Sequence, residues 1–154
     1  MGVSGCGKST VGKLLADNLN IDFYDADDFH PDANITKMKN GQALNDTDRK
    51  PWLLLLSQKL KEWQQKGGAV LACSALKENY RQLLMSNNLD TIKWIYLKGT
   101  FEVISERIGK RENHFMKSDL LKSQFETLEI PEYGLHIDIK KEPAEIIKQV
   151  ICQI

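Results

Sequence analysis

No part of the sequence narrows the choice of fold as much as a glycine-rich segment near its start, Gly2-Val-Ser-Gly-Cys-Gly-Lys-Ser9. It matches the pattern G-x-x-x-x-G-K-[ST], a loop whose backbone N–H groups surround nucleotide phosphates. Lys8 is expected to reach the β- and γ-phosphates of a nucleotide, and the Ser9 hydroxyl to ligate Mg²⁺. A chance glycine-rich turn is the alternative, but the amphipathic helix expected over residues 8–19 supplies the context that phosphate binding requires. The segment therefore predicts a site for a nucleotide and Mg²⁺, and the predicted nucleotide contacts are Gly2, Val3, Ser4, Gly5, Cys6, Gly7, Lys8, Ser9 and Thr10.

Only Met1 precedes this loop, whereas the pattern normally follows a buried β-strand. Each buried aliphatic side chain of such a strand contributes about 1.5–3 kcal/mol. A few of them rival the stability of a whole domain, which is about 5–15 kcal/mol. We therefore expect that the chain is truncated at its N-terminus, and mass spectrometry of the endogenous protein would show whether this short form is made.

Composition excludes several classes of protein. The chain has 154 residues, enough for one domain, with 21 basic and 21 acidic residues. The balanced charge argues against a nucleic-acid partner, and no apolar run is long enough to span a membrane. The three cysteines form no C-x-x-C pair, which argues against a zinc site or a disulfide framework. Reduced thiols and the absence of an apolar signal core favour a cytoplasmic protein.

Strand-like and helix-like apolar patterns alternate along the chain, which predicts an α/β fold with a mostly parallel sheet between two layers of helices. Helices are expected over residues 8–19, 31–41, 46–66, 76–85, 101–111, 118–128 and from 143 onward, and strands over 21–24, 69–73, 92–97 and 135–139. No internal repeat or linker divides the chain, so residues 1–154 are expected to form a single domain.

An acidic cluster follows the first predicted strand. Ligands bind at the carboxyl ends of strands in open α/β sheets, and the spacing of Asp25 and Asp27 places both on the same side of an extended backbone. If the strand continues, Asp28 points the other way. A solvated turn is the alternative for such a cluster.

Longer segments carry a family resemblance: residues 23–31 (FYDADDFHP), 44–52 (LNDTDRKPW), 72–81 (ACSALKENYR) and 114–129, which begins HFM and ends SQFETLE. In this order they resemble the small gluconate kinases, and the resemblance covers the chain from Met1 to its end. It implies a P-loop kinase, related in architecture to shikimate kinase, that uses ATP to phosphorylate D-gluconate. It also implies a helical lid at about residues 108–120 and, as for many family members, allows a homodimer.

The resemblance assigns roles to the acidic cluster. Asp25 would hold Mg²⁺ through water, and Asp27 would act on the attacking hydroxyl as orienter or general base. His30 would contact a hydroxyl of the polyol. A turn or capping residue is the usual role of a lone histidine before proline.

Three basic residues are candidates for the substrate carboxylate, since arginine pairs with a carboxylate in a planar, bidentate geometry. We rank Arg49 first, Arg81 second and Lys77 third, and a solvated helix face is the alternative for each. Ser74, at the end of the predicted strand 69–73, is a further candidate for substrate contact.

Arg107 and Arg111 lie four residues apart on a predicted helix, the spacing that opens the mobile lid of related kinases. There the first arginine stacks on adenine and the second reaches phosphate. The resemblance therefore assigns Arg107 to the nucleotide and Arg111, with Lys8 and Asp27, to catalysis. Exposed helix charges paired with neighbouring glutamates are the alternative.

The predicted function is transfer of the γ-phosphoryl group of ATP to the 6-hydroxyl of D-gluconate. A kinase of another small acid or nucleotide is a second interpretation, and comparison of acceptors separates the two. A catalytically impaired, truncated nucleotide-binding form is the rival from another class. A chain that shows no cooperative melting with or without ATP·Mg²⁺ would favour that rival.

Overall fold

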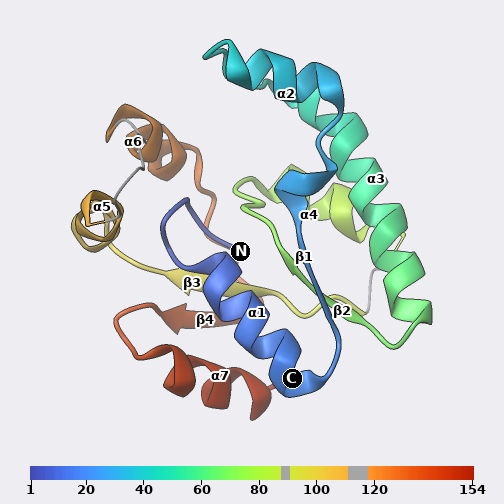
Figure 1. The fold of residues 1–154 in the computed structure, drawn as a ribbon, viewed down its shortest axis with the longest axis vertical. Coiled ribbons are helices and arrows are strands. Elements are labelled where there is room, and N and C mark those ends of the chain that lie inside the picture. The colour runs from blue at the N-terminus through green and yellow to red at the C-terminus, as the bar shows by residue number, and fades with distance from the viewer. Residues whose placement is uncertain (88–90, 111–117) are drawn as a thin grey trace.

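The computed structural model describes residues 1–87, 91–110 and 118–154, in which helices and strands alternate along most of the chain (Figure 1). The helices are α1 (Lys8–Leu19), α2 (Asp32–Lys39), α3 (Asp46–Gln65), α4 (Glu78–Met85), α5 (Phe101–Gly109), α6 (Ser118–Thr127) and α7 (Pro143–Ile151), with a short 3₁₀ helix, η1 (Ala26–Phe29). The strands are β1 (Asp22–Asp25), β2 (Ala69–Ala72), β3 (Ile95–Lys98) and β4 (Leu135–Asp138). Apart from η1, every element lies where the sequence predicts one, with bounds that shift by a few residues.

The bounds of the longest helix, α3, follow from local chemistry. Its N-cap Asn45 accepts a hydrogen bond from the Asp48 N–H at 2.9 Å, and the Asp48 carboxylate accepts one from the Asn45 N–H at 2.8 Å. This capping box satisfies N–H groups that the start of a helix leaves without partners. Gly67 and Gly68, both with positive φ, end the helix just beyond Gln65.

The strands form two parallel pairs. β1 runs beside β2 with Asp25 opposite Ala72, and β3 runs beside β4 with Leu97 opposite Ile137. In the described parts of the chain no ladder joins β2 to β3. The parallel direction that the sequence predicts is confirmed, and the sheet is divided into two half-sheets.

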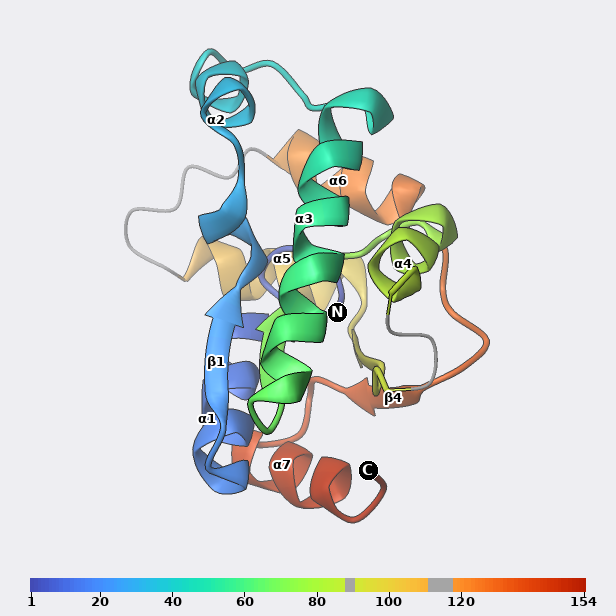
Figure 2. The same cartoon turned by 90° about the vertical axis from the view of Figure 1, so that its right-hand side faces the viewer.

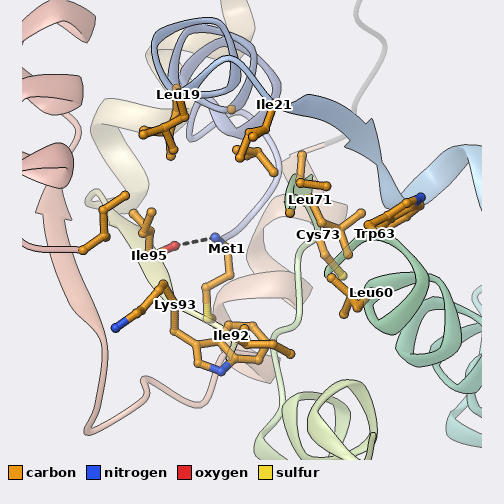
Figure 3. A pocket seen from close by; sticks show the side chains of 18 of the residues that line it. Met1, Leu19, Ile21, Leu60, Trp63, Leu71, Cys73, Ile92, Lys93 and Ile95 are labelled. Atoms are coloured by element: carbon orange, nitrogen blue, oxygen red, sulfur yellow. Dashed lines mark hydrogen bonds between the residues drawn. The ribbon is translucent and has the colours of Figure 1, made fainter. Parts of the chain in front are cut away.

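The space between the half-sheets is an apolar cavity of about 290 Å³ (Figure 3). Met1 lies in this space: its nitrogen donates to the Ile95 carbonyl at 2.5 Å, and its carbonyl accepts from the Leu97 N–H at 3.0 Å. Just beyond it, the Gly2 N–H donates to the Ser74 carbonyl at 3.2 Å. The backbone of Met1 and Gly2 is therefore a narrow bridge between β3 and the end of β2. The cavity wall includes Leu19, Ile21, Leu60, Trp63, Leu71 and Ile92.

Helices cover the strands from two sides (Figures 1 and 2). α1 and α7 pack together on one side, and α3 and α4 on the other. Two apolar cores lie on the two sides of the strands. Val11 of α1, Ile104 of α5 and Val150 of α7 belong to the first, and Leu56 of α3 and Leu84 of α4 belong to the second. Within the described residues, no helix is long and apolar enough to cross a membrane. The result is the three-layer α/β arrangement that the sequence predicts.

Candidate active site

The glycine-rich segment forms a loop that leads into the N-terminus of α1. Gly5 and Gly7 have φ values of 80° and 101°, a region that side chains disfavour. A Cβ on Gly5 would also lie 2.6 Å from Cγ1 of Ile108 on α5, so both backbone and space require glycine there. The Ser4 N–H donates to Oε1 of Gln124 at 2.6 Å, which ties the loop to α6.

Lys8 lies over this loop. Its Nζ donates to the carbonyl oxygens of Gly2 and Val3, both at 3.1 Å. The ammonium group is therefore held against the backbone, where a bound phosphate would meet it. Val3 and Cys6 are 2% and 1% exposed, so they contribute to the loop through their backbone. Thr10 is exposed on the first turn of α1.

The structure brings the two predicted metal-ligating residues together. The Ser9 hydroxyl donates to Oδ2 of Asp25 at 2.9 Å, and Oδ1 of Asp25 accepts from the Asp27 N–H at 3.2 Å. Hydroxyl and carboxylate oxygens suit Mg²⁺, which takes few protein ligands and completes its shell with water and phosphate. Among the residues that the structure describes, no group of three His, Cys, Asp or Glu side chains could hold a metal. The Ser9 and Asp25 oxygens supply two ligands of the kind that Mg²⁺ takes from protein.

Asp27 is placed by η1 and not by a continued strand. β1 ends at Asp25, whose side chain caps η1. The side chains of residues 25–28 therefore do not alternate between the two sides of an extended strand. The side chain of Asp27 is 84% exposed, yet nearby protein atoms limit the hydration of its charge. This effect, followed by the charge of Asp25, raises the pKa of the Asp27 carboxyl. His30 and Lys8 act in the opposite direction. An accessible carboxylate with a raised pKa is suited to accept a proton.

His30 is packed beside Asp27. Its side chain is 7% exposed and stacks on Trp52, with the ring centroids 4.1 Å apart. Its Nε2 lies 3.9 Å from Oδ1 of Asp27, and its Nδ1 lies 3.4 Å from the amide nitrogen of Asn34. Burial lowers the pKa of His30, which favours the neutral ring. The ring borders the carboxylate, and its contact with a polyol hydroxyl stays a prediction.

The three basic residues ranked for the substrate carboxylate have different surroundings. Lys77 is paired with Asp46, with its Nζ 3.0 Å from Oδ2 of that residue. Arg49 is half-buried, and its Nη1 donates to the hydroxyl of Tyr80 at 3.3 Å. In the described part of the chain Arg49 has no carboxylate partner. Arg49 lies on α3 three residues before Trp52, the ring on which His30 stacks, and its charge contributes to the lowered pKa of His30.

Arg81 departs from the prediction. Its side chain is 1% exposed, and its Nη1 donates to the carbonyls of Ala75 at 2.9 Å and Leu76 at 3.2 Å. Its Nε and Nη2 bind the Glu78 carboxylate at 2.9 Å and 2.8 Å, and its Nε also reaches the Tyr133 hydroxyl at 3.1 Å. With these partners and 1% exposure, the guanidinium is enclosed by the protein and not open to substrate. Arg81 instead holds the turn around Ala75, whose φ is 44°, and α4 begins after this turn at Glu78.

The remaining candidates are Arg107, Ser74 and Arg111. Nη2 of Arg107 donates to the carbonyl of Ile139 at 2.5 Å, just beyond β4. Ser74 is half-buried, and its carbonyl accepts from the Gly2 N–H. Arg111 and most of the expected lid lie outside the described residues.

Sequence reasoning missed two residues beside Arg49, namely Asp46 and Tyr80. Both lie in segments that carry the family resemblance, but acidic and aromatic residues on helices are usually capping or core groups. The polar residues that surround Arg49 and Lys77 in the sequence were the signal that could have indicated Asp46 and Tyr80. Nothing local links position 46 to position 80.

Comparisons with known proteins are consistent with this geometry. The family model described as shikimate kinase matches residues 4–153. Gluconokinase from Gluconobacter oxydans is 42% identical over 155 residues, which cover 98% of this chain and 86% of that protein. Thermoresistant gluconokinase from Escherichia coli is 47% identical over 132 residues, which cover 85% of this chain and 75% of that protein. A solved gluconokinase structure from Sinorhizobium meliloti is similar with a TM-score of 0.88 and 37% identity, covering 99% of this chain and 87% of that one.

Proposed function

Because the chain belongs to the gluconokinases, within the shikimate kinase family of P-loop kinases, we propose that it transfers the γ-phosphoryl group of ATP to the 6-hydroxyl of D-gluconate. The products are 6-phospho-D-gluconate and ADP. The rival interpretation, a catalytically impaired nucleotide-binding form, is not favoured, because the likeness to gluconokinases extends over nearly the whole chain.

The observation that carries the proposal is the arrangement of charge beside the phosphate loop. Lys8 lies over the phosphate loop, and the His30 Nε2 lies 3.9 Å from the Asp27 carboxylate. His30 in turn stacks on Trp52 of α3, the helix that carries Arg49. D-Gluconate has a hydroxyl at C6 and a carboxylate at the other end of its carbon chain. Asp27 suits the first group and Arg49 the second. Lys77 and Arg81 are already paired with acidic residues of the protein.

In this mechanism the substrate hydroxyl attacks the γ-phosphorus in line. Asp27 orients the hydroxyl and accepts its proton as the new O–P bond forms. Lys8 and the N–H groups of the loop stabilise the charge that spreads over the phosphoryl oxygens. Arg49 binds the carboxylate and so fixes which hydroxyl faces the nucleotide.

Ser9 and Asp25 would hold a Mg²⁺ ion together with the nucleotide. When bound, this ion supplies positive charge at the β- and γ-phosphates. We assign Arg107 to the adenine side of the nucleotide and Arg111 to the phosphates, and the segment at about residues 108–120 to a lid within a single domain. The free thiols of Cys6, Cys73 and Cys152 support a cytoplasmic location.

The test is an acceptor comparison. ADP release and, with 6-phosphogluconate dehydrogenase, product formation are measured with D-gluconate, D-glucose and shikimate. We expect kcat/KM for D-gluconate to exceed that for D-glucose, which lacks the carboxylate, by at least about 100-fold. Equal use of D-glucose, or preference for shikimate, would contradict the proposal. The Arg49→Met variant should lose most of the preference for the acid.

A further inference from the structure

A cluster of four side chains joins the start of α3 to the start of α4: Asp46, Arg49, Lys77 and Tyr80, here called the Tyr80 cluster. The Tyr80 hydroxyl donates to Oδ1 of Asp46, and the Arg49 Nη1 lies 3.3 Å from the same hydroxyl. Lys77 Nζ contacts both oxygens of Asp46, at 3.1 Å and 3.0 Å. The Arg49 Cζ and the Lys77 Nζ lie 5.6 Å and 5.5 Å from the centroid of the Tyr80 ring. The cluster thus places two cations around one phenol.

The direction of each hydrogen bond in the Tyr80 cluster follows from the chemistry of its members. A carboxylate accepts only, so the single proton of the Tyr80 hydroxyl points at Asp46. A guanidinium donates only, so the oxygen of the same hydroxyl accepts from Arg49. The bonds from Tyr80 and Lys77 lower the pKa of Asp46, so this carboxylate stays ionised and the direction is kept at neutral pH. Asp46 therefore presents the Tyr80 oxygen to Arg49.

The direct contacts in the Tyr80 cluster are divided unequally. Asp46 pairs directly with Lys77, whereas Arg49 acts on Asp46 only through its charge and is held by a neutral oxygen and the face of a ring. Tyr80 is 6% exposed, so its ring is fixed by the surrounding core. An acidic residue at this position would fix the guanidinium equally well but would cancel its charge. A phenol keeps the position and leaves the charge for an incoming anion.

We propose that Tyr80 is a positioning residue for recognition of the substrate carboxylate: it holds the Arg49 guanidinium in a fixed orientation while leaving its charge and its remaining N–H groups for the sugar acid. Asp46 orients the Tyr80 hydroxyl for this task. The inference rests on the proposed function, in which Arg49 binds the carboxylate of D-gluconate. It adds a determinant of acid specificity that does not itself touch the reacting atoms.

The test is the Tyr80→Phe variant, which removes one oxygen and keeps the buried ring. We expect KM for D-gluconate to rise about tenfold, with kcat and KM for ATP within about twofold of wild type, because the loss affects binding of the carboxylate end. Tyr24→Phe is the matched control. The Tyr24 hydroxyl also donates to an aspartate, Asp22, at 3.1 Å, but away from Arg49, so its removal should leave both KM values unchanged.

A double-mutant cycle separates positioning from a general structural effect. In an Arg49→Met background, Tyr80→Phe should raise KM for D-gluconate no further, because the group that Tyr80 positions is gone. Asp46→Asn is a second variant at a side chain that is 53% exposed, so folding is preserved even if Tyr80→Phe is unstable. It should raise KM for D-gluconate about threefold.

The outcomes distinguish the role of Tyr80 from the proposed function of the chain. Unchanged KM for D-gluconate in both Tyr80→Phe and Asp46→Asn, with an active wild type, would overturn the role of Tyr80 and leave the proposed function intact. Equal effects of Tyr80→Phe with and without Arg49 would do the same. A wild-type chain that phosphorylates other acceptors but not D-gluconate would overturn both.

Discussion

Replacing Arg81 by methionine tests whether this buried cation supports the fold or the substrate. The variant keeps an unbranched chain of similar length but removes a guanidinium that is 1% exposed. The carbonyls of Ala75 and Leu76 lose their side-chain donor, and Glu78 and Tyr133 lose their shared partner. Glu78 is 37% exposed and keeps the Tyr133 hydroxyl, so it loses less than the roughly 3–5 kcal/mol of a fully buried ion pair. Each of the two orphaned carbonyls adds about 1–3 kcal/mol.

We therefore expect Arg81→Met to lower the free energy of unfolding by about 3–5 kcal/mol. For a domain of this size that corresponds to a fall in Tm of roughly 6–20 °C. Urea denaturation gives the free energy and a thermal melt gives Tm. Below the melting range, KM for D-gluconate should stay within about threefold of wild type, because the loop around Ala75 shifts only slightly.

Arg49→Met should have the opposite effect, with a small loss of stability and a large rise in KM for D-gluconate. Arg49 is half-buried and makes one hydrogen bond to Tyr80, so its loss should cost about 1 kcal/mol of stability. It should raise KM for D-gluconate by about 100-fold, since a charge-assisted pair with the substrate is lost. If Arg81→Met melted like wild type and raised KM as Arg49→Met does, the placement of Arg81 as a structural residue would be refuted.

Further substitutions probe the phosphate loop and the acidic pair beside it. Asp27→Asn should lower kcat by about 10²–10⁴-fold with little change in KM for ATP, as measured in the coupled assay. Because the pKa of Asp27 is raised, wild-type kcat/KM should fall as pH drops through a pKa higher than that of a free aspartate, and Asp27→Asn should lack this limb. Gly5→Ala should destabilise the protein by about 2–4 kcal/mol, from left-handed strain and overpacking against Ile108. Gly41→Ala, with a φ of 73° and open space, should cost only the strain, about 1 kcal/mol, and equal urea midpoints for the two would refute the clash. Ser9→Ala should raise the Mg²⁺ concentration needed for half-maximal activity, and an unchanged Mg²⁺ titration would exclude Ser9 as a ligand.

Local patterns were sufficient to predict the helices and strands. The ends of α3 follow from Asn45, Asp48 and the glycine pair after Gln65, all of which are readable within a few residues. The contact between Ser9 and Asp25 was also predictable, because the phosphate loop and the end of the first strand meet at one edge of a parallel sheet.

The features that could not be predicted from the sequence depend on contacts between residues that are distant along the chain. Arg81 is buried because Tyr133, far along the chain, approaches it from another segment. Tyr80 and Asp46 meet only when α3 packs on α4. The short helix η1 was missed for a different reason: the Asp25 side chain bonds to the Asp27 N–H, and that turn competes with continued extension of the strand.

The division into two half-sheets has a consequence for cooperativity. The two half-sheets share a core on the side of α1, where Val11 and Leu15 cluster with Leu97 of β3 and Ile137 of β4. The backbone link between β3 and the end of β2, however, runs through Met1 and Gly2, at the entrance to the phosphate loop. The Gly2 and Leu97 amide hydrogens in this link should therefore exchange at a lower opening free energy than those within the two strand pairs. A nucleotide that binds the loop would add its binding energy at this point and slow that exchange. The phosphate loop would then stabilise the connection between the half-sheets as well as hold the nucleotide.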